Sequence, residues 1–155
     1  MPAWRRYAGT LYGAAGSGLA AAMDRGFPTI IISGSYGIVV AAEPIGVYDR
    51  RFALTDWPEA LLSDCLLATA ERLGVDHVVA FCSYSTGYAK LVRRVPWRRQ
   101  QIEAVLLAPD MGGGGGAQVF VPRASGEALA AFVEGGLSST WTSSDGVPIR
   151  VETQS

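Results

Sequence analysis

Short apolar runs, each followed by a polar or glycine-rich turn, recur along this chain and constrain its fold more than any other feature. They are residues 29–32, 77–82 and 104–108. Runs of this length, rich in β-branched residues, predict buried strands. Apolar residues at helical spacing lie at 7–25, 55–73 and 87–95, and glycine or proline ends each segment. We therefore expect an α/β fold with three layers: a mostly parallel, Rossmann-like sheet with helices on both faces.

The last third of the chain is less regular. Five consecutive glycines, Gly112–Gly116, predict a flexible loop. Beyond them, Val119–Val121 are predicted as a strand, Gly126–Val133 as a helix and Val147–Val151 as a terminal edge strand. The chain has 155 residues, of which 49% are apolar. We expect a single domain over residues 1–155, large enough to bury a core without disulfides or a structural metal.

Charge and residue usage argue against several classes of protein. The net charge of −1 supplies no long-range field that would gather nucleic acid or anionic membrane. The two cysteines lack CxxC spacing and the chain has one histidine, so we expect no metal site, and no cofactor is indicated. No signal peptide or membrane span is evident, which predicts a cytoplasmic protein without a membrane partner. Arginine-rich, lysine-poor usage is typical of a GC-rich bacterial genome.

Two hydroxyl-rich turns follow the first two predicted strands, at Ser33–Gly37 and Ser83–Gly87. The carboxyl ends of parallel strands share one edge of a sheet, so both turns should face the same ligand. Free N–H groups and hydroxyls suit a phosphate, a carboxylate or a sugar hydroxyl. The alternative is that these residues only make tight turns. The predicted ligand-binding residues are Ser33, Gly34, Ser35, Tyr36, Gly37, Ser83, Tyr84, Ser85 and Tyr88.

Acidic side chains follow the first turn. Glu43, Tyr48 and Asp49 are the predicted catalytic residues, because a carboxylate pair can protonate a leaving group and stabilise an electrophilic carbon, as in glycosidic cleavage. The alternative for Asp49 is an ion pair with Arg50 or Arg51 on a solvated loop. The motifs GxxxxGK[ST] and GxGxxG are absent, which disfavours ATP hydrolysis and Rossmann-type NAD binding.

A basic segment, Lys90–Arg99, offers a second kind of site. Cationic side chains could contact phosphates while an aromatic ring stacks on a base. The predicted nucleic-acid residues are Arg93, Arg94, Trp97, Arg98 and Arg99. The alternative is a solvated helix end whose cations complement the helix dipole. Cys82 is interpreted as a core residue, since no base accompanies it.

Residues 32–39, Ile-Ser-Gly-Ser-Tyr-Gly-Ile-Val, are followed by Glu43-Pro44-Ile45 and Tyr48-Asp49. This order of a strand, a Ser-x-x-Tyr-Gly turn, an acid and a tyrosine resembles the YaaA family of peroxide-stress proteins and its shorter uncharacterised relatives. Tyr7–Tyr12 also resembles the helix start of those relatives, so the similarity covers roughly residues 5–95. It implies a cytosolic protein linked to oxidative stress and DNA binding, without an agreed catalytic mechanism. Members usually begin with one further strand, so we expect that first strand to be missing and a sheet edge to be exposed.

The first hypothesis for function is a YaaA-like protein, plausibly an enzyme, that holds a nucleoside, nucleotide or similarly polar ligand between the two turns. Hydrolysis or transfer at a glycosidic carbon is the first reaction to test. The alternative is a nucleic-acid-binding protein of the oxidative-stress response, whose binding should weaken steeply with salt. A third hypothesis is a homo-oligomer that pairs through an exposed sheet edge.

Overall fold

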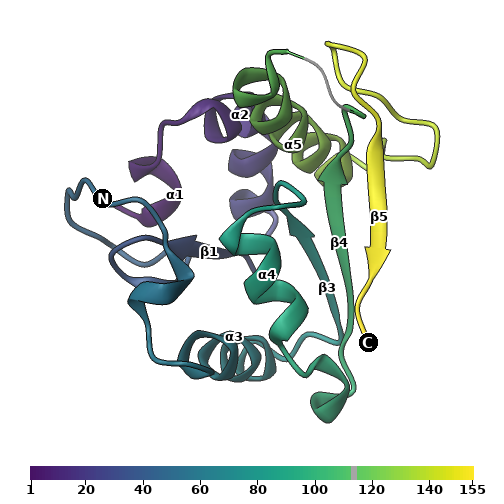
Figure 1. Cartoon of the computed structure of the whole chain (residues 1–155). Coiled ribbons are helices and arrows are strands. Elements are labelled where there is room, and N and C mark those ends of the chain that lie inside the picture. The colour runs from purple at the N-terminus through teal and green to yellow at the C-terminus, as the bar shows by residue number, and fades with distance from the viewer. Residues whose placement is uncertain (113–114) are drawn as a thin grey trace.

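The computed structural model describes residues 1–112 and 115–155. The predicted flexible loop Gly112–Gly116 falls partly on residues 113–114, which lie outside the described residues, so its flexibility stays a prediction. The chain is mixed α/β, as predicted (Figure 1). The helices are α1 (Ala3–Arg6), α2 (Thr10–Asp24), α3 (Leu61–Arg72), α4 (Gly87–Arg94) and α5 (Ala117–Val133), with short 3-10 turns η1 (Leu54–Asp56) and η2 (Trp97–Gln100). The strands are β1 (Ile30–Ser33), β2 (Gly37–Val40), β3 (His77–Phe81), β4 (Glu103–Pro109) and β5 (Ile149–Thr153).

The larger sheet has the order β3-β4-β5. β3 pairs with β4 in parallel, and β5 then pairs antiparallel to β4 at the right-hand margin of Figure 1. Among the described strand pairs, the β3–β4 pair is the single parallel one, so the expected mostly parallel sheet is not confirmed. The predicted terminal edge strand is confirmed in β5.

Helices cover both faces of this sheet. Leu106 of β4 belongs to a core that includes Leu91 and Val92 of α4. On the other face, Phe81 of β3 packs against Phe132 of α5, with ring centroids 5.8 Å apart. Helix α2 lies along α5 on its far side (Figure 1). Alternation along the strands therefore sends successive side chains to α4 and to α5.

The strand predicted at residues 29–32 is confirmed as β1, but its predicted parallel pairing is wrong. β1 forms a two-stranded antiparallel hairpin with β2, in the register Ile30↔Val40 to Ser33↔Gly37. The hairpin is covered on both faces, since Ile31 and Val39 join one apolar cluster while Ile30, Ile32 and Ile38 pack on the other. A strand that is buried on both faces has the same apolar pattern in a hairpin as in a parallel sheet, which explains the error.

The predicted strand Val119–Val121 is also wrong, because these residues lie in α5. This helix buries small residues, Ala124, Gly126 and Ala128 among them, and packs along α2. Tertiary packing of that face therefore outweighs the local β-propensity of Val-Phe-Val. Helix α3 begins at Leu61 and not near Thr55, which lies in η1.

Candidate functional site

The first hydroxyl-rich turn is the turn of the β1–β2 hairpin. Ser33 at the end of β1 is 1% exposed, and its Oγ accepts a hydrogen bond from the Tyr36 N–H at 3.1 Å. The same Oγ lies 2.8 Å from the hydroxyl of Tyr48. A Cβ at Gly34 would lie 2.1 Å from the Arg50 carbonyl oxygen, so only glycine fits between the turn and the returning chain. The structure thus brings together three predicted site residues, Ser33, Tyr36 and Tyr48.

The chain of hydroxyls continues into the N-terminal segment, where the sequence reasoning assigned no site residue. The Tyr48 hydroxyl also bonds the hydroxyl of Tyr7, and the Tyr7 ring stacks on Tyr12 with centroids 5.0 Å apart. Tyr36 meets Tyr48 edge to face, with centroids 5.6 Å apart, and its hydroxyl accepts from the Gly46 N–H at 3.0 Å. We call Tyr7, Ser33, Tyr36 and Tyr48 the hydroxyl cluster.

Burial keeps part of this region neutral. It raises the pKa of Tyr7 and of Tyr12 well above the ordinary tyrosine value, and it also raises the pKa of Tyr88. A tyrosine of ordinary pKa is already protonated at physiological pH, and the raised pKa extends the neutral range of these three phenols to higher pH. Neutral hydroxyls suit hydrogen bonds to sugar hydroxyls, carbonyls or ring nitrogens better than they suit a cation.

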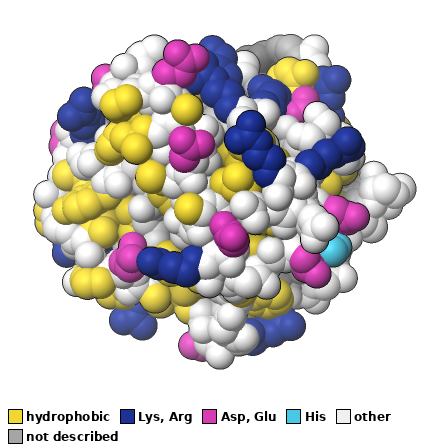
Figure 2. Space-filling model, turned by 90° about the horizontal axis from the view of Figure 1, so that it is seen from below, with side chains coloured by type: hydrophobic (Ala, Val, Ile, Leu, Met, Phe, Trp, Pro, Cys, Tyr) yellow, Lys and Arg dark blue, Asp and Glu magenta, His cyan; other side chains and the backbone are white. Residues whose placement is uncertain are grey.

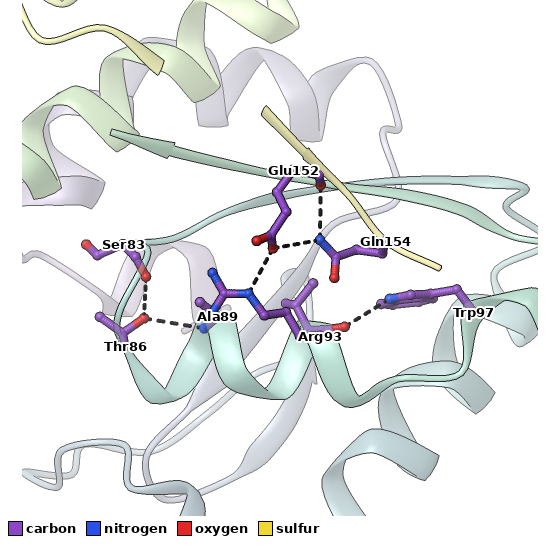
Figure 3. A network of polar contacts seen from close by, with 8 residues as sticks. Ser83, Thr86, Ala89, Arg93, Trp97, Glu152 and Gln154 are labelled. Atoms are coloured by element: carbon purple, nitrogen blue, oxygen red, sulfur yellow. Dashed lines mark hydrogen bonds and ion pairs between the residues drawn. The ribbon is translucent and has the colours of Figure 1, made fainter. Parts of the chain in front are cut away.

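The second hydroxyl-rich turn joins β3 to α4 (Figure 3). Its Thr86 is the N-cap of α4: Oγ1 donates to the Ser83 carbonyl at 2.8 Å and accepts from the Ala89 N–H at 3.4 Å. The polar groups of Thr86 thus serve the helix end, as the tight-turn interpretation expects. Ser85 and Tyr84 are exposed.

Residues 50–52 lie between the two turns in space and contact both of them. At one end, the backbone of Arg50 contacts Gly34 of the first turn. At the other end, the Phe52 ring stacks on Tyr88 with centroids 4.7 Å apart and contacts Gly87. The two turns belong to different sheets, not to one sheet edge as predicted, but they flank the same short segment.

The two predicted acids do not lie together: Glu43 is remote from the hydroxyl cluster, whereas Asp49 directly follows Tyr48 in the chain. Glu43 follows β2, and its carboxylate accepts from the Val40 N–H at 3.0 Å, at the end of the hairpin opposite Ser33. Strands of four residues separate these ends by roughly 10 Å at about 3.3 Å per residue. Asp49 is exposed beside Tyr48. Arg50, one of the two expected partners of Asp49, pairs instead with Asp56 at 3.0 Å.

Neither of the two best-defined hollows among the described residues borders the hydroxyl cluster. One, of about 200 Å³, lies between β2 and α3; it is lined by Ile38, Val40, Glu43, Ala68, Thr69 and Arg72. The other, of about 20 Å³ beside Trp57 and Leu91, has room for little more than a water molecule.

The aromatic side chain of the predicted nucleic-acid segment is buried. Trp97 is 1% exposed and its indole N–H donates to the Val92 carbonyl at 3.0 Å, so the prediction that it stacks on a base is wrong. Arg93 is half-buried and bonds Glu152 at 2.8 Å (Figure 3). Arg94, Arg98 and Arg99 are exposed. Seen from the side of α3 and η2, cationic and acidic side chains are interspersed and form no continuous basic surface (Figure 2).

Acid should weaken the contact between Arg93 and Glu152. The hydrogen bond from Arg93, with a second from Gln154, holds the pKa of Glu152 below its ordinary value. A lowered carboxyl pKa stabilises the fold above the unfolded-state value, and this stabilisation is lost as the pH falls through the lowered pKa. We expect Glu152→Gln to be less stable than the wild type at neutral pH and equally stable in acid. Urea unfolding across that pH range measures the difference.

The matched control is the same substitution in an Arg93→Met background. There Glu152→Gln should change the free energy of unfolding only slightly at every pH, because the main cause of the pKa shift is gone. An unchanged pH dependence in the Arg93→Met background would contradict the assignment.

Within residues 1–112 and 115–155, no helix is long and apolar enough to cross a membrane. The same described residues contain no group of three or more His, Cys, Asp or Glu side chains placed to hold a metal ion. No protein-family model matches the chain, and no match was found among curated proteins or solved structures. The resemblance to the YaaA family therefore stays a prediction.

Proposed function

We propose that this chain is a YaaA-like cytoplasmic protein that binds a small polar ligand of the nucleoside or nucleotide class on the surface around the hydroxyl cluster. The observation that carries the proposal is the linked set of hydroxyls from Tyr7, Tyr48 and Ser33, which come from three separate segments of the chain. The half-buried Tyr7 and Tyr48 hydroxyls and the aromatic rings around them can hydrogen-bond a sugar and stack on a base, while the buried Ser33 hydroxyl holds Tyr48 in position.

The position of the second turn supports a shared site. Tyr88 follows that turn and stacks on Phe52, next to the residues that contact Gly34. If the protein is an enzyme, Asp49 is the carboxylate that the chain places next to Tyr48, and Glu43 is assigned no part. Hydrolysis or transfer at a glycosidic carbon is the reaction to test first.

A thermal-shift screen tests the proposal. Nucleosides, nucleotides, sugar phosphates and short oligonucleotides are added to the wild type, Ser33→Ala, Tyr48→Phe and Glu43→Gln. A ligand at a hundredfold excess over its Kd should raise the wild-type Tm by about 5–10 °C. The shift should be lost in Ser33→Ala and Tyr48→Phe, each compared with its own unliganded Tm, and kept in Glu43→Gln.

Two other outcomes of the screen would contradict the proposal. A shift lost only in Glu43→Gln would place the ligand in the hollow beside Arg72 and overturn the proposal. Stabilisation by oligonucleotides alone, abolished by added salt, would instead favour phosphate contacts by the exposed arginines.

A further inference from the structure

The outer edge of β5 pairs with no other strand among the described residues. β5 pairs with β4 on one side, and no strand of residues 1–112 or 115–155 lies on the other side (Figure 1). Val151 at its centre is 61% exposed. Natural proteins often protect such an edge with proline, a bulge or charges, especially lysine; β5, Ile-Arg-Val-Glu-Thr, has no proline or lysine, and its two charges are of opposite sign. An open, β-branched edge of this kind favours pairing with another strand.

The backbone pattern shows which groups are free to pair. The Gln154 N–H donates to the Ala104 carbonyl, and the Pro148 carbonyl accepts from the Asp110 N–H. The backbone N–H and C=O groups of the even-numbered residues of β5 therefore point toward β4. Residues alternate in an antiparallel ladder, which directs the N–H and C=O groups of Ile149, Val151 and Thr153 outward. Thr142 forms an isolated antiparallel bridge with Pro148, next to Ile149, so the free part of this edge is centred on Val151 and Thr153.

We propose that β5 pairs antiparallel with β5 of a second copy of this chain, about a two-fold axis at Val151. This register places Arg150 opposite Glu152 of the partner subunit, and Glu152 opposite the partner's Arg150. Both ion pairs lie on one face of the joined sheet, because Arg150 and Glu152 are two residues apart and side chains alternate between the two faces of a strand. Oppositely charged cross-strand pairs stabilise antiparallel sheets.

Charge also excludes the neighbouring registers. A two-fold axis at Arg150 would bring two arginines face to face, and an axis at Glu152 would do the same with two glutamates. Only the axis at Val151 pairs all five residues of β5 and opposes unlike charges. The contact is self-complementary and closed, so it yields a dimer with one continuous six-stranded sheet.

Both charged side chains are held in place before any partner binds. The Arg150 guanidinium lies 4.7 Å from the centroid of Tyr84, and Arg93 bonds Glu152 at 2.8 Å (Figure 3). Side chains that are already ordered lose less entropy on association. The other carboxylate oxygen of Glu152 stays available to a partner arginine.

Sedimentation equilibrium on the full chain, from about 1 μM to about 1 mM, tests association. We expect a reversible monomer–dimer equilibrium. Val151→Pro removes an outward N–H without breaking the bond to β4, and it should raise the dimer Kd at least tenfold with circular dichroism unchanged. Val151→Thr keeps the N–H and the branched shape and should dimerise like the wild type. A monomer at every concentration, or a dimer indifferent to Val151→Pro, would overturn the proposal.

Cysteine cross-linking tests the register in a Cys65→Ser background. Val151→Cys should form an intermolecular disulfide on oxidation, because directly opposed residues have Cα atoms about 5.5 Å apart. Thr153→Cys is the matched control: its copies would lie four residues out of register, roughly 13 Å apart, and should remain reduced. Efficient cross-linking at 153 but not at 151 would refute the two-fold axis at Val151.

Discussion

Replacing Trp97 by alanine should lower the free energy of unfolding by about 3–5 kcal/mol, because the substitution empties a fully packed site. The side chain is 1% exposed and lies in the core formed by α3, α4 and β4. Alanine would also leave the Val92 carbonyl without its indole donor. For a chain of this size the change corresponds to a fall in Tm of about 10 °C, which thermal unfolding followed by circular dichroism would measure.

Two controls separate burial from charge. Trp97→Phe keeps most of the packing and should cost about 1–2 kcal/mol. Arg98→Ala removes an exposed neighbour and should change stability by less than about 0.5 kcal/mol. A Trp97→Ala protein with normal stability but weakened oligonucleotide binding would contradict the burial of Trp97 and restore its base-stacking role.

The strands and helices that local signals define were predictable. β3 and β4 are short apolar runs, and α4 is bounded by a threonine N-cap and by Pro96. Long-range pairing was not predictable in the same way. β1 is apolar on both faces whether its neighbour is parallel or antiparallel, and the apolar run of β2 contains no signal for the direction of the chain.

The antiparallel pairing of β1 and β2 also explains why only some of the predicted site residues lie together. Ser33, Tyr36 and Tyr48 could be predicted because a glycine-containing turn and a nearby tyrosine were visible in the sequence. Glu43 was grouped with them by sequence distance, but the antiparallel return of β2 carries it to the other end of the hairpin. Tyr7 had no local signal, since its place beside Tyr48 depends on tertiary packing of the N-terminal segment.

Trp97 shows how an aromatic residue among arginines misleads. Arg98 and Arg99 on its C-terminal side are exposed, so the local composition is that of a surface. Pro96 ends the helical run, and the following 3-10 turn brings the indole back to the last turn of α4. The buried position follows from this reversal, which no property of the isolated segment requires.

The second large effect is expected where α2 and α5 pack at backbone distance. A Cβ at Gly126 of α5 would lie 2.2 Å from the Leu11 carbonyl oxygen and 2.8 Å from the Ala15 nitrogen. Because these are backbone atoms, the helices would have to separate. Gly126→Ala should therefore cost about 2–3 kcal/mol, although alanine is the better helix former by up to about 1 kcal/mol. Chemical unfolding in urea would measure the loss.

Gly13→Ala is the matched control, since Gly13 lies in α2 and a Cβ there would meet nothing within 4 Å. It should stabilise the protein by about 0.5–1 kcal/mol through helix propensity alone. Helix α2 also carries Tyr12, which stacks on Tyr7 of the hydroxyl cluster. Separation of the two helices by Gly126→Ala should for this reason also reduce ligand-induced stabilisation, whereas Gly13→Ala should leave it intact. Equal effects of the two substitutions would show that α2 and α5 are not in backbone contact.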